Sequence, residues 1–196
     1  GEISHVVFPL TAIVALHGST ASGYLSELAL VGREGMVGIS SFMGGNSSPS
    51  DAVVFSVGEG LRMRAQVLLE AFERSVAVRH LMLRYTQALI TQMAQTSVCN
   101  RHHTVDQAFS RWLLLSLDRA QGAELNMTHE AIAGMLGVRR EGVTGAALKL
   151  QRLGLIRYAR GRIHVLDREG LMGVTCECYS VIKNEYDRLL PMGLAK

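Results

Sequence analysis

The sequence predicts an α+β fold in three parts: an antiparallel β jelly roll, a long helix and a C-terminal winged helix-turn-helix. Short β-rich runs separated by Gly, Ser, Asn and Pro occupy residues 3–65, a rhythm typical of antiparallel barrels and jelly rolls. After Gln66 the hydrophobic period changes from two to about 3.6, which indicates helices. Near the C-terminus two short amphipathic segments meet at Gly137, and two β-rich segments follow them. That order predicts a helix-turn-helix with a wing.

The jelly roll is expected to occupy residues 1–73. Its strands are expected in the runs HVVFPL, AIVALHG, YLSELALVG, DAVVFSV and LRMRA. Because the first of these runs begins almost at the start of the chain, we expect the N-terminal strands of a complete jelly roll to be missing. Hydrophobic residues make up 48% of the composition, which is enough to build real cores.

A helix is expected from about Ser75 to Val98, in a middle segment of residues 74–100. It has two apolar sides, the second including Leu81 and Ile90, and a helix of this kind must bury both. One side is expected to pack on the jelly roll and the other on an identical helix of a second subunit. Burial of the whole helix within one monomer is the alternative. The residues that we assign to the homodimer contact are Val78, Met82, Tyr85 and Leu89.

The C-terminal module is expected to occupy residues 101–196. Helices are predicted at about 104–120, 128–136 and 139–153, the last two forming the helix-turn-helix. Segments 156–159 and 162–166 are predicted to pair as a hairpin, with Arg160-Gly161 as its turn. Asp167 is predicted to cap one final helix that ends near Leu190, before Pro191.

Positive charge is concentrated in this module. Between Asn126 and Arg168 there are eight Lys or Arg residues and three acidic ones, although the whole chain has a net charge of only +3. Such a local surplus favours a polyanionic partner, and the helix pair favours double-stranded DNA. A solvated basic face, or a module that binds a protein or an anionic surface beside a ligand- or redox-sensing barrel, is the alternative.

The second helix of the pair is expected to bury Val143, Ala146 and Leu150, which leaves other side chains of its first turns facing outward. Arg can donate two hydrogen bonds to guanine and Glu can accept one from cytosine. The residues predicted to contact bases are therefore Arg139, Arg140, Glu141 and Thr144. Those predicted to contact phosphates are Thr128, His129, Lys149, Arg152, Arg157, Arg160 and Arg162.

The segment MTHEAIAGMLGVRREGVTGAALKLQRLGLIRYARGRIHVLD resembles the winged helix of the Crp/Fnr family of bacterial transcription regulators. The C-N-x-x-H of residues 99–103, RWLL at 111–114 and CECYSVIKNEYDRLL resemble one branch of that family, and ISHVVFPLTAIVAL resembles the middle of its cyclic-nucleotide-binding-type barrel. The resemblance implies a sensory barrel with an unknown small-molecule or redox effector, a homodimer held by the long helix, and RNA polymerase as a further partner. It places Arg140, Glu141 and Thr144 on base-contacting positions. Gly145 departs from it, because family members commonly carry an Arg there.

The resemblance also implies where cAMP would bind, and the sequence departs there too. Ile39 stands where a ribose-binding Glu is expected, and Ser50-Asp51 stands at the Arg-Ser site for the cyclic phosphate. A phosphate that faced Asp51 without an Arg would be strongly disfavoured. We therefore expect no cAMP binding and assign no cofactor.

The remaining chemistry-bearing residues give no further assignment. Cys99, His102, His103, Cys176 and Cys178 include zinc-ligating residue types, but a one-residue gap between cysteines is not typical of zinc sites, and packing explains buried cysteines equally well. We therefore predict no metal site. No GxSxG, Walker-type or HExxH motif is present, so we expect no enzyme. The chain has neither a membrane-length apolar run nor a signal-peptide pattern, so a cytoplasmic protein without membrane contacts is expected.

Overall fold

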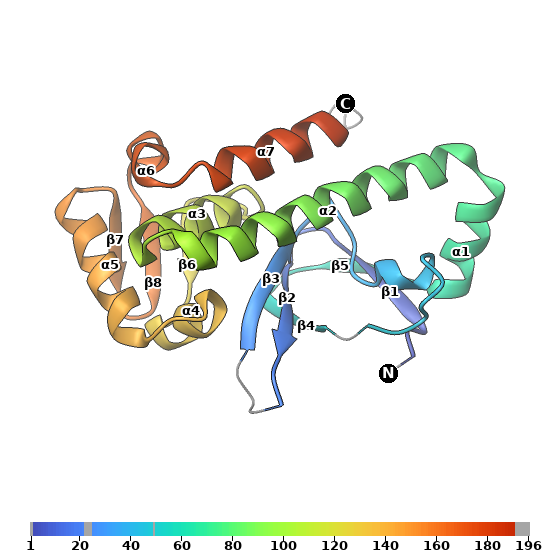
Figure 1. Cartoon of the computed structure of the whole chain (residues 1–196), viewed down its shortest axis with the longest axis horizontal. Helices are drawn as coiled ribbons and strands as arrows, with labels where there is room; N and C mark the ends of the chain where they lie inside the picture. Colours follow the sequence, from blue (N-terminus) through green and yellow to red (C-terminus); the bar gives the residue numbers. More distant parts are fainter. Residues whose placement is uncertain (1, 22–24, 49, 191–196) are drawn as a thin grey trace.

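The structure is a computed structural model that describes residues 2–21, 25–48 and 50–190 (Figure 1). It confirms the predicted α+β class. Strands form the N-terminal domain, one long helix runs beside them, and a mostly helical module follows (Figure 1). In the described part of the chain, no helix is long and apolar enough to cross a membrane.

The N-terminal domain contains two antiparallel sheets. β2 (Ile13–Ser19) lies between β3 (Leu25–Val31) and β4 (Asp51–Ser56), and β1 (His5–Pro9) pairs with β5 (Gly60–Arg64). All five strands match the predicted runs, although β2 and β5 each extend one residue beyond their run. At the centre of the larger sheet, Ile13, Ala15 and Leu30 are fully buried. Among the described residues, the two sheets are not joined into a closed barrel.

Two helices follow the sheets. α1 (Ala65–Arg74) leads into α2 (Val76–His102), which begins one residue after the predicted start at Ser75 and continues four residues beyond the predicted end. The Ser75 hydroxyl accepts a hydrogen bond from the amide of Val78, which satisfies one of the free donors of the first turn. α2 extends past the sheets to the C-terminal module (Figure 1).

The side of α2 that carries Val78, Met82, Tyr85 and Leu89, the residues that we assigned to a dimer contact, packs on the protomer's own N-terminal domain. Tyr85 and Leu89 are almost fully buried in the single chain, and the Tyr85 hydroxyl donates a 2.7 Å hydrogen bond to the carbonyl of Met36. The face that is free in the protomer carries Leu83 and Ile90, each 49% exposed. Two apolar sides were expected, and only the packing shows which one the sheet covers.

The C-terminal module begins with α3 (Val105–Leu117), where Thr104 and Gln107 form a capping box. After it come β6 (Glu124–Asn126), α4 (His129–Leu136), α5 (Arg140–Arg152), β7 (Ile156–Ala159) and β8 (Arg162–Val165). These elements match the predicted helix-turn-helix and hairpin, and β6 is a third strand of the wing sheet that the sequence analysis missed.

The predicted final helix is two helices. α6 (Arg168–Val174) begins at the predicted Asp167 cap and stops at Thr175, and α7 (Cys178–Leu189) continues to the predicted end. Gly170 and Gly173 weaken this stretch, and the extended backbone of Thr175 turns the chain. The break allows α7 to lie along α2 (Figure 1).

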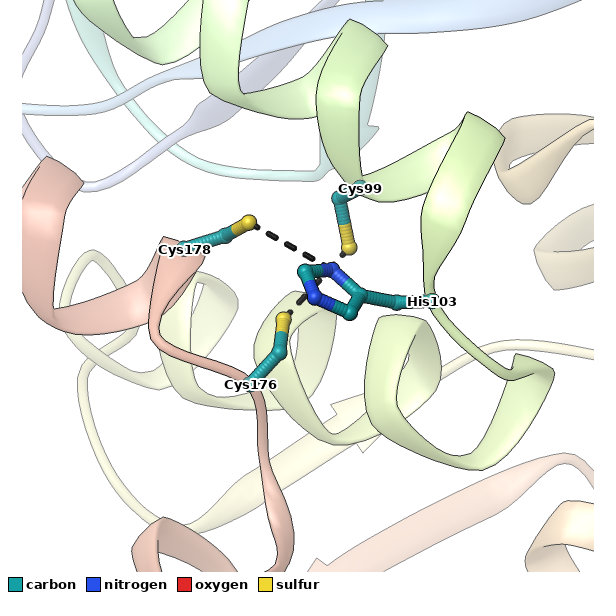
Figure 2. Close-up of side chains that lie close together, drawn as sticks. All are labelled: Cys99, His103, Cys176 and Cys178. Carbon is teal, nitrogen blue, oxygen red and sulfur yellow. Dashed lines mark hydrogen bonds between the residues drawn. The ribbon is translucent and has the colours of Figure 1, made fainter.

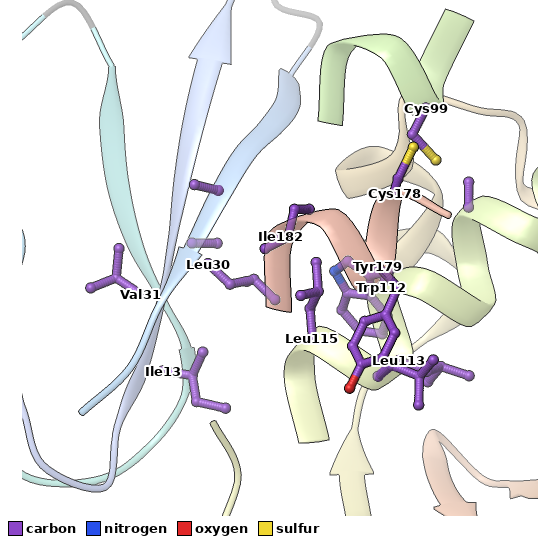
Figure 3. Close-up of a cluster of buried hydrophobic side chains, with 14 of the residues drawn as sticks. Ile13, Leu30, Val31, Cys99, Trp112, Leu113, Leu115, Cys178, Tyr179 and Ile182 are labelled. Carbon is purple, nitrogen blue, oxygen red and sulfur yellow. The ribbon is translucent and has the colours of Figure 1, made fainter. Parts of the chain in front are cut away.

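One continuous hydrophobic core joins the sheets to the C-terminal module. Leu30 and Val31 of β3, Trp112 and Leu115 of α3, and Ile182 of α7 belong to the same buried cluster (Figure 3). Two buried polar contacts cross this junction. The indole nitrogen of Trp112 donates a 3.0 Å hydrogen bond to Glu27 of β3. The guanidinium of Arg119, just after α3, forms a 2.7 Å ion pair with Glu34.

Candidate nucleic-acid interface

The turn between α4 and α5 brings the two helices together. Thr128 caps α4 by accepting a hydrogen bond from the amide of Ala131. α4 ends at Gly137, whose φ of 65° lies in the left-handed region. Glycine adopts this backbone conformation without strain because it has no Cβ. Arg139 is the N-cap of α5. The amino-terminal pole of α5, which favours anions, therefore lies directly after this turn.

The first turn of α5 presents the predicted base-contacting side chains to solvent. Arg139, Arg140 and Glu141 are exposed, while Val143, Ala146 and Ala147 on the opposite face are buried. None of the three charged side chains forms an ion pair with a described residue. Two guanidinium groups and one carboxylate are thus free at the end of a helix that a major groove can accept.

Thr144 and His129 are less free than the sequence suggested. The hydroxyl of Thr144 lies 3.0 Å from Nδ1 of His129 and 3.1 Å from the carbonyl of Arg140, to which it donates. The imidazole of His129 also stacks on the ring of Tyr158 with centroids 4.3 Å apart. Burial and then the charge of Arg140 lower the pKa of His129, which favours the neutral ring. These contacts hold α4, α5 and the wing together.

The predicted phosphate-contacting residues fall into two groups. Arg152, Arg157, Arg160 and Arg162 are all exposed, on the end of α5 and on the wing. Lys149, by contrast, faces α3, where its ammonium pairs with the carboxylate of Asp106. A phosphate contact by Lys149 would require this ion pair to open.

The wing tip has the predicted Arg160-Gly161 turn. Both residues have positive φ, 51° and 78°, as a tight hairpin turn with two left-handed residues requires. Arginine tolerates this conformation poorly. A residue such as Asn would fit the turn better, so Arg160 is better explained by the charge that it brings to the tip.

Gly145 lies on the exposed side of α5. A Cβ built at this position meets no atom within 4 Å, so the glycine is not required by packing. In the family that the sequence resembles, an Arg is common at this position. The structure leaves space for a larger side chain than glycine there.

A cavity of about 500 Å³ lies in the N-terminal domain, next to α2. Val7, Leu16, Leu28 and Leu89 give it a largely apolar wall, and its few polar side chains are His5 and serines. Ile39 and Ser50, where the family pattern would have a Glu and an Arg, both line it. Among the described residues, no Arg, Lys, Asp or Glu lines this cavity. It suits an apolar or weakly polar ligand.

Comparison with known proteins agrees with this geometry. Residues 107–174 match the Crp-like helix-turn-helix domain family. FixK2 from Bradyrhizobium japonicum has a similar structure, with a TM-score of 0.75 and 18% identity over 90% of this chain and 89% of that chain. The chain has the fold of a Crp/Fnr-type transcription regulator. A CRP-family transcriptional regulator from Thermus thermophilus is also similar, with a TM-score of 0.72 and 18% identity over 88% of each chain. No curated relative matches the sequence.

The fold also brings together residues that lie far apart in the sequence. Cys99, His103, Cys176 and Cys178 converge at the end of α2 (Figure 2), and Glu27 and Arg119 lie buried between the sheets and the C-terminal module. For the three cysteines and the histidine, the only signal in the sequence was that these residue types can bind metals. For Glu27 and Arg119 the sequence contained no signal, because an isolated Glu or Arg in a strand or helix is usually exposed.

Proposed function

We propose that this Crp/Fnr-type regulator is a cytoplasmic homodimer that binds an inverted-repeat DNA sequence through α5 and responds to an effector other than cAMP. The observation that carries the proposal is the free guanidinium pair of Arg139 and Arg140 at the start of the second helix of a Crp-like helix-turn-helix. Two such helices can enter successive major grooves about 34 Å apart. The domain limits that we propose are 1–73, 74–100 and 101–196.

The free face of α2 is the surface that we assign to the homodimer. Leu83 and Ile90 are seven residues apart and half exposed, so they lie two turns apart on one side of the helix, the spacing of a two-helix contact. A second copy of α2 would cover them. The two winged helices would then be held at a fixed distance, as an inverted repeat requires.

The cavity beside α2 is the proposed effector site. Because Leu89 of α2 forms part of its wall, a ligand there would contact the dimer helix and could shift the spacing of the two DNA-binding modules. The cavity offers no guanidinium to a cyclic phosphate, so cAMP is not the effector that we propose. RNA polymerase remains a proposed further partner.

Selection from a random pool of DNA duplexes tests DNA recognition directly. A sequence-specific regulator is expected to enrich one inverted repeat, and to bind it at least about a thousand times more tightly than random duplex. A module that binds a protein or an anionic surface would bind duplexes weakly and without a sequence preference. Failure to enrich any sequence would contradict the proposed function.

Arg140→Ala is expected to weaken binding to the selected sequence by about 1–3 kcal/mol and to reduce discrimination at one position of each half-site, because the lost guanidinium bonds a base edge. The measurement is fluorescence anisotropy with the selected duplex and single-base variants of it. Arg79→Ala, an exposed Arg on α2 far from α5, is the control. Unchanged discrimination in Arg140→Ala would show that Arg140 does not contact bases.

Arg160→Asn is expected to weaken binding to all duplexes alike. Asn accepts the left-handed conformation at this position, so the turn remains and only the charge is lost. Loss of one phosphate contact should lower the slope of log affinity against log salt concentration by about one. The measurement is a salt titration of wild type and variant on one duplex. An unchanged slope would exclude a phosphate contact at the wing tip.

Ile90→Glu is expected to convert the protein to monomers and to lower its affinity for the inverted repeat at least tenfold. A carboxylate in the centre of an apolar two-helix contact would be buried without a partner, which costs several kcal/mol. Sedimentation analysis gives the oligomeric state. Gln121→Glu, at an exposed position outside α2, is a control for added charge. A dimeric Ile90→Glu variant would contradict the assigned face.

A further inference from the structure

Four side chains with metal-ligating atoms meet where α2 ends and α7 begins. Cys99 lies in the last turn of α2, His103 follows that helix, Cys176 precedes α7 and Cys178 is its first residue (Figure 2). One ligand atom from each of the four lies within 4.8 Å of every other. The three thiols are buried, at 0%, 4% and 1% exposed, and the His103 side chain is 15% exposed.

The distances between these atoms are close to those of a tetrahedral zinc site. With Zn–S bonds of about 2.3 Å and Zn–N bonds of about 2.0 Å, neighbouring ligand atoms of a tetrahedron are about 3.5–3.8 Å apart. The Sγ atoms of Cys99 and Cys176 are 3.5 Å apart, and Sγ of Cys178 is 3.6 Å from Nδ1 of His103. A small inward movement of the remaining atoms would complete the coordination.

The imidazole of His103 is held in the orientation that a metal ligand needs. Its Nδ1 faces the thiols, while its Nε2 lies 3.3 Å from a carboxylate oxygen of Glu177. A carboxylate that accepts the other N–H of a ligating histidine is the usual outer partner in zinc sites, because it fixes the ring and increases its basicity. Glu177, between the two cysteines, is therefore a positioning residue.

The surroundings suit the charge of the complex as well. Zinc with three thiolates and one neutral imidazole carries a net charge of −1. Arg111 of α3 is 1% exposed, and its charge acts on Glu27 and on the thiols of Cys99 and Cys178. Among the described residues it forms no ion pair within 4 Å. A buried cation beside the cluster would offset that negative charge.

We propose that Cys99, His103, Cys176 and Cys178 bind one zinc ion in a structural site. The four protein ligands leave no open position for a reacting molecule, and binding releases the thiol protons to solvent. The ion would tie the end of the dimer helix to α7, and so fix the winged helix relative to α2. The predicted final helix, from Asp167 to near Leu190, would place both cysteines of Cys-x-Cys on one helix. Cys176 lies before α7, so its thiol turns toward Cys99.

Zinc content is the first measurement. Full-length protein, expressed with zinc in the medium and purified without chelators, is expected to contain close to one zinc ion per chain by elemental analysis. Cys178→Ser and His103→Ala are expected to lose most of this zinc, and His102→Ala, an exposed neighbour, to keep it. Wild-type protein without zinc, or full retention of zinc in both variants, would overturn the proposal. A disulfide between Cys99 and Cys176 in zinc-free wild-type protein would overturn it too.

Two further measurements need no disruptive substitution. Wild-type protein stripped of metal should regain its melting temperature on addition of zinc, with a shift of at least about 5 °C, and cobalt(II) should give the visible absorption of a tetrahedral thiolate complex. Glu177→Gln should weaken zinc binding about 10–100-fold in a chelator competition, while Glu169→Gln, an exposed Glu of α6, should not. An octahedral cobalt spectrum would overturn the site, and equal zinc affinities in the two variants would overturn the role of Glu177.

Discussion

Arg119→Ala is expected to lower the free energy of unfolding by roughly 3–5 kcal/mol, the usual cost of removing one partner from a buried ion pair. The Arg119 guanidinium forms the 2.7 Å ion pair with Glu34, donates to Gln92 at 3.0 Å and to the Leu115 carbonyl at 2.9 Å, and lies over the ring of Tyr186. Its removal leaves the carboxylate of Glu34, whose side chain is only 14% exposed, without a counter-charge.

Urea unfolding followed by circular dichroism, at one protein concentration, measures this loss. Lys183→Ala is the matched control, because Lys183 pairs with Asp187 on the surface of α7, and exposed pairs within a helix contribute about 0.3–0.5 kcal/mol. Arg119 joins the loop after β3 to α2, α3 and α7, so its loss should also make the sheets and the C-terminal module unfold in separate steps. Equal stabilities of the two variants would refute the role given to Arg119.

Glu27→Gln is expected to remove a pH dependence of stability worth about 3 kcal/mol. Burial raises the pKa of Glu27 from 4.5 to about 7, against the smaller opposing effects of the Trp112 hydrogen bond and the charges of Arg111 and Arg119. At pH values between these two pKa values, Glu27 keeps its proton in the folded chain but has lost it in the unfolded chain. The free energy of unfolding therefore falls as the pH rises through this range. At about 1.4 kcal/mol per pKa unit, the total is about 3 kcal/mol.

The measurement is the difference in unfolding free energy between Glu27→Gln and wild type, at about pH 4 and at about pH 8. Gln is neutral and keeps an oxygen for the Trp112 indole, so the difference should change in favour of the variant by about 3 kcal/mol as the pH rises. Glu124→Gln, an exposed residue of β6, should show no such change. A difference that does not depend on pH would mean that Glu27 ionises at its ordinary pKa in the folded protein.

Most elements of the fold could be predicted because their signals are local. The Asp167 cap, the helix break at Gly137 and the Arg160-Gly161 turn each depend on residues within about four positions along the chain, and the structure has all of them. The break at Thr175 was missed because the apolar pattern continues across it. The apolar pattern does not show that α7 packs against α2.

The candidate interface was predicted in part. Exposure of Arg139, Arg140 and Glu141 follows from the apolar face of α5 alone, since that face fixes the opposite one. The engagement of Thr144 with His129, and of Lys149 with Asp106, depends on the neighbouring helix. Residues 15 and 43 positions apart in sequence meet only after the helices have packed.

By itself, the sequence determined most of the strands and helices and their order, the helix-turn-helix with its basic first turn, and the presence of two apolar sides on α2. Tertiary structure alone decided which of those sides the sheet covers, and that Cys99 lies against Cys176, 77 positions away. The physical reason is the range of the forces involved. Backbone hydrogen bonds and caps act over a turn or two, whereas the contacts of a buried side chain are set by whichever distant element packs against it.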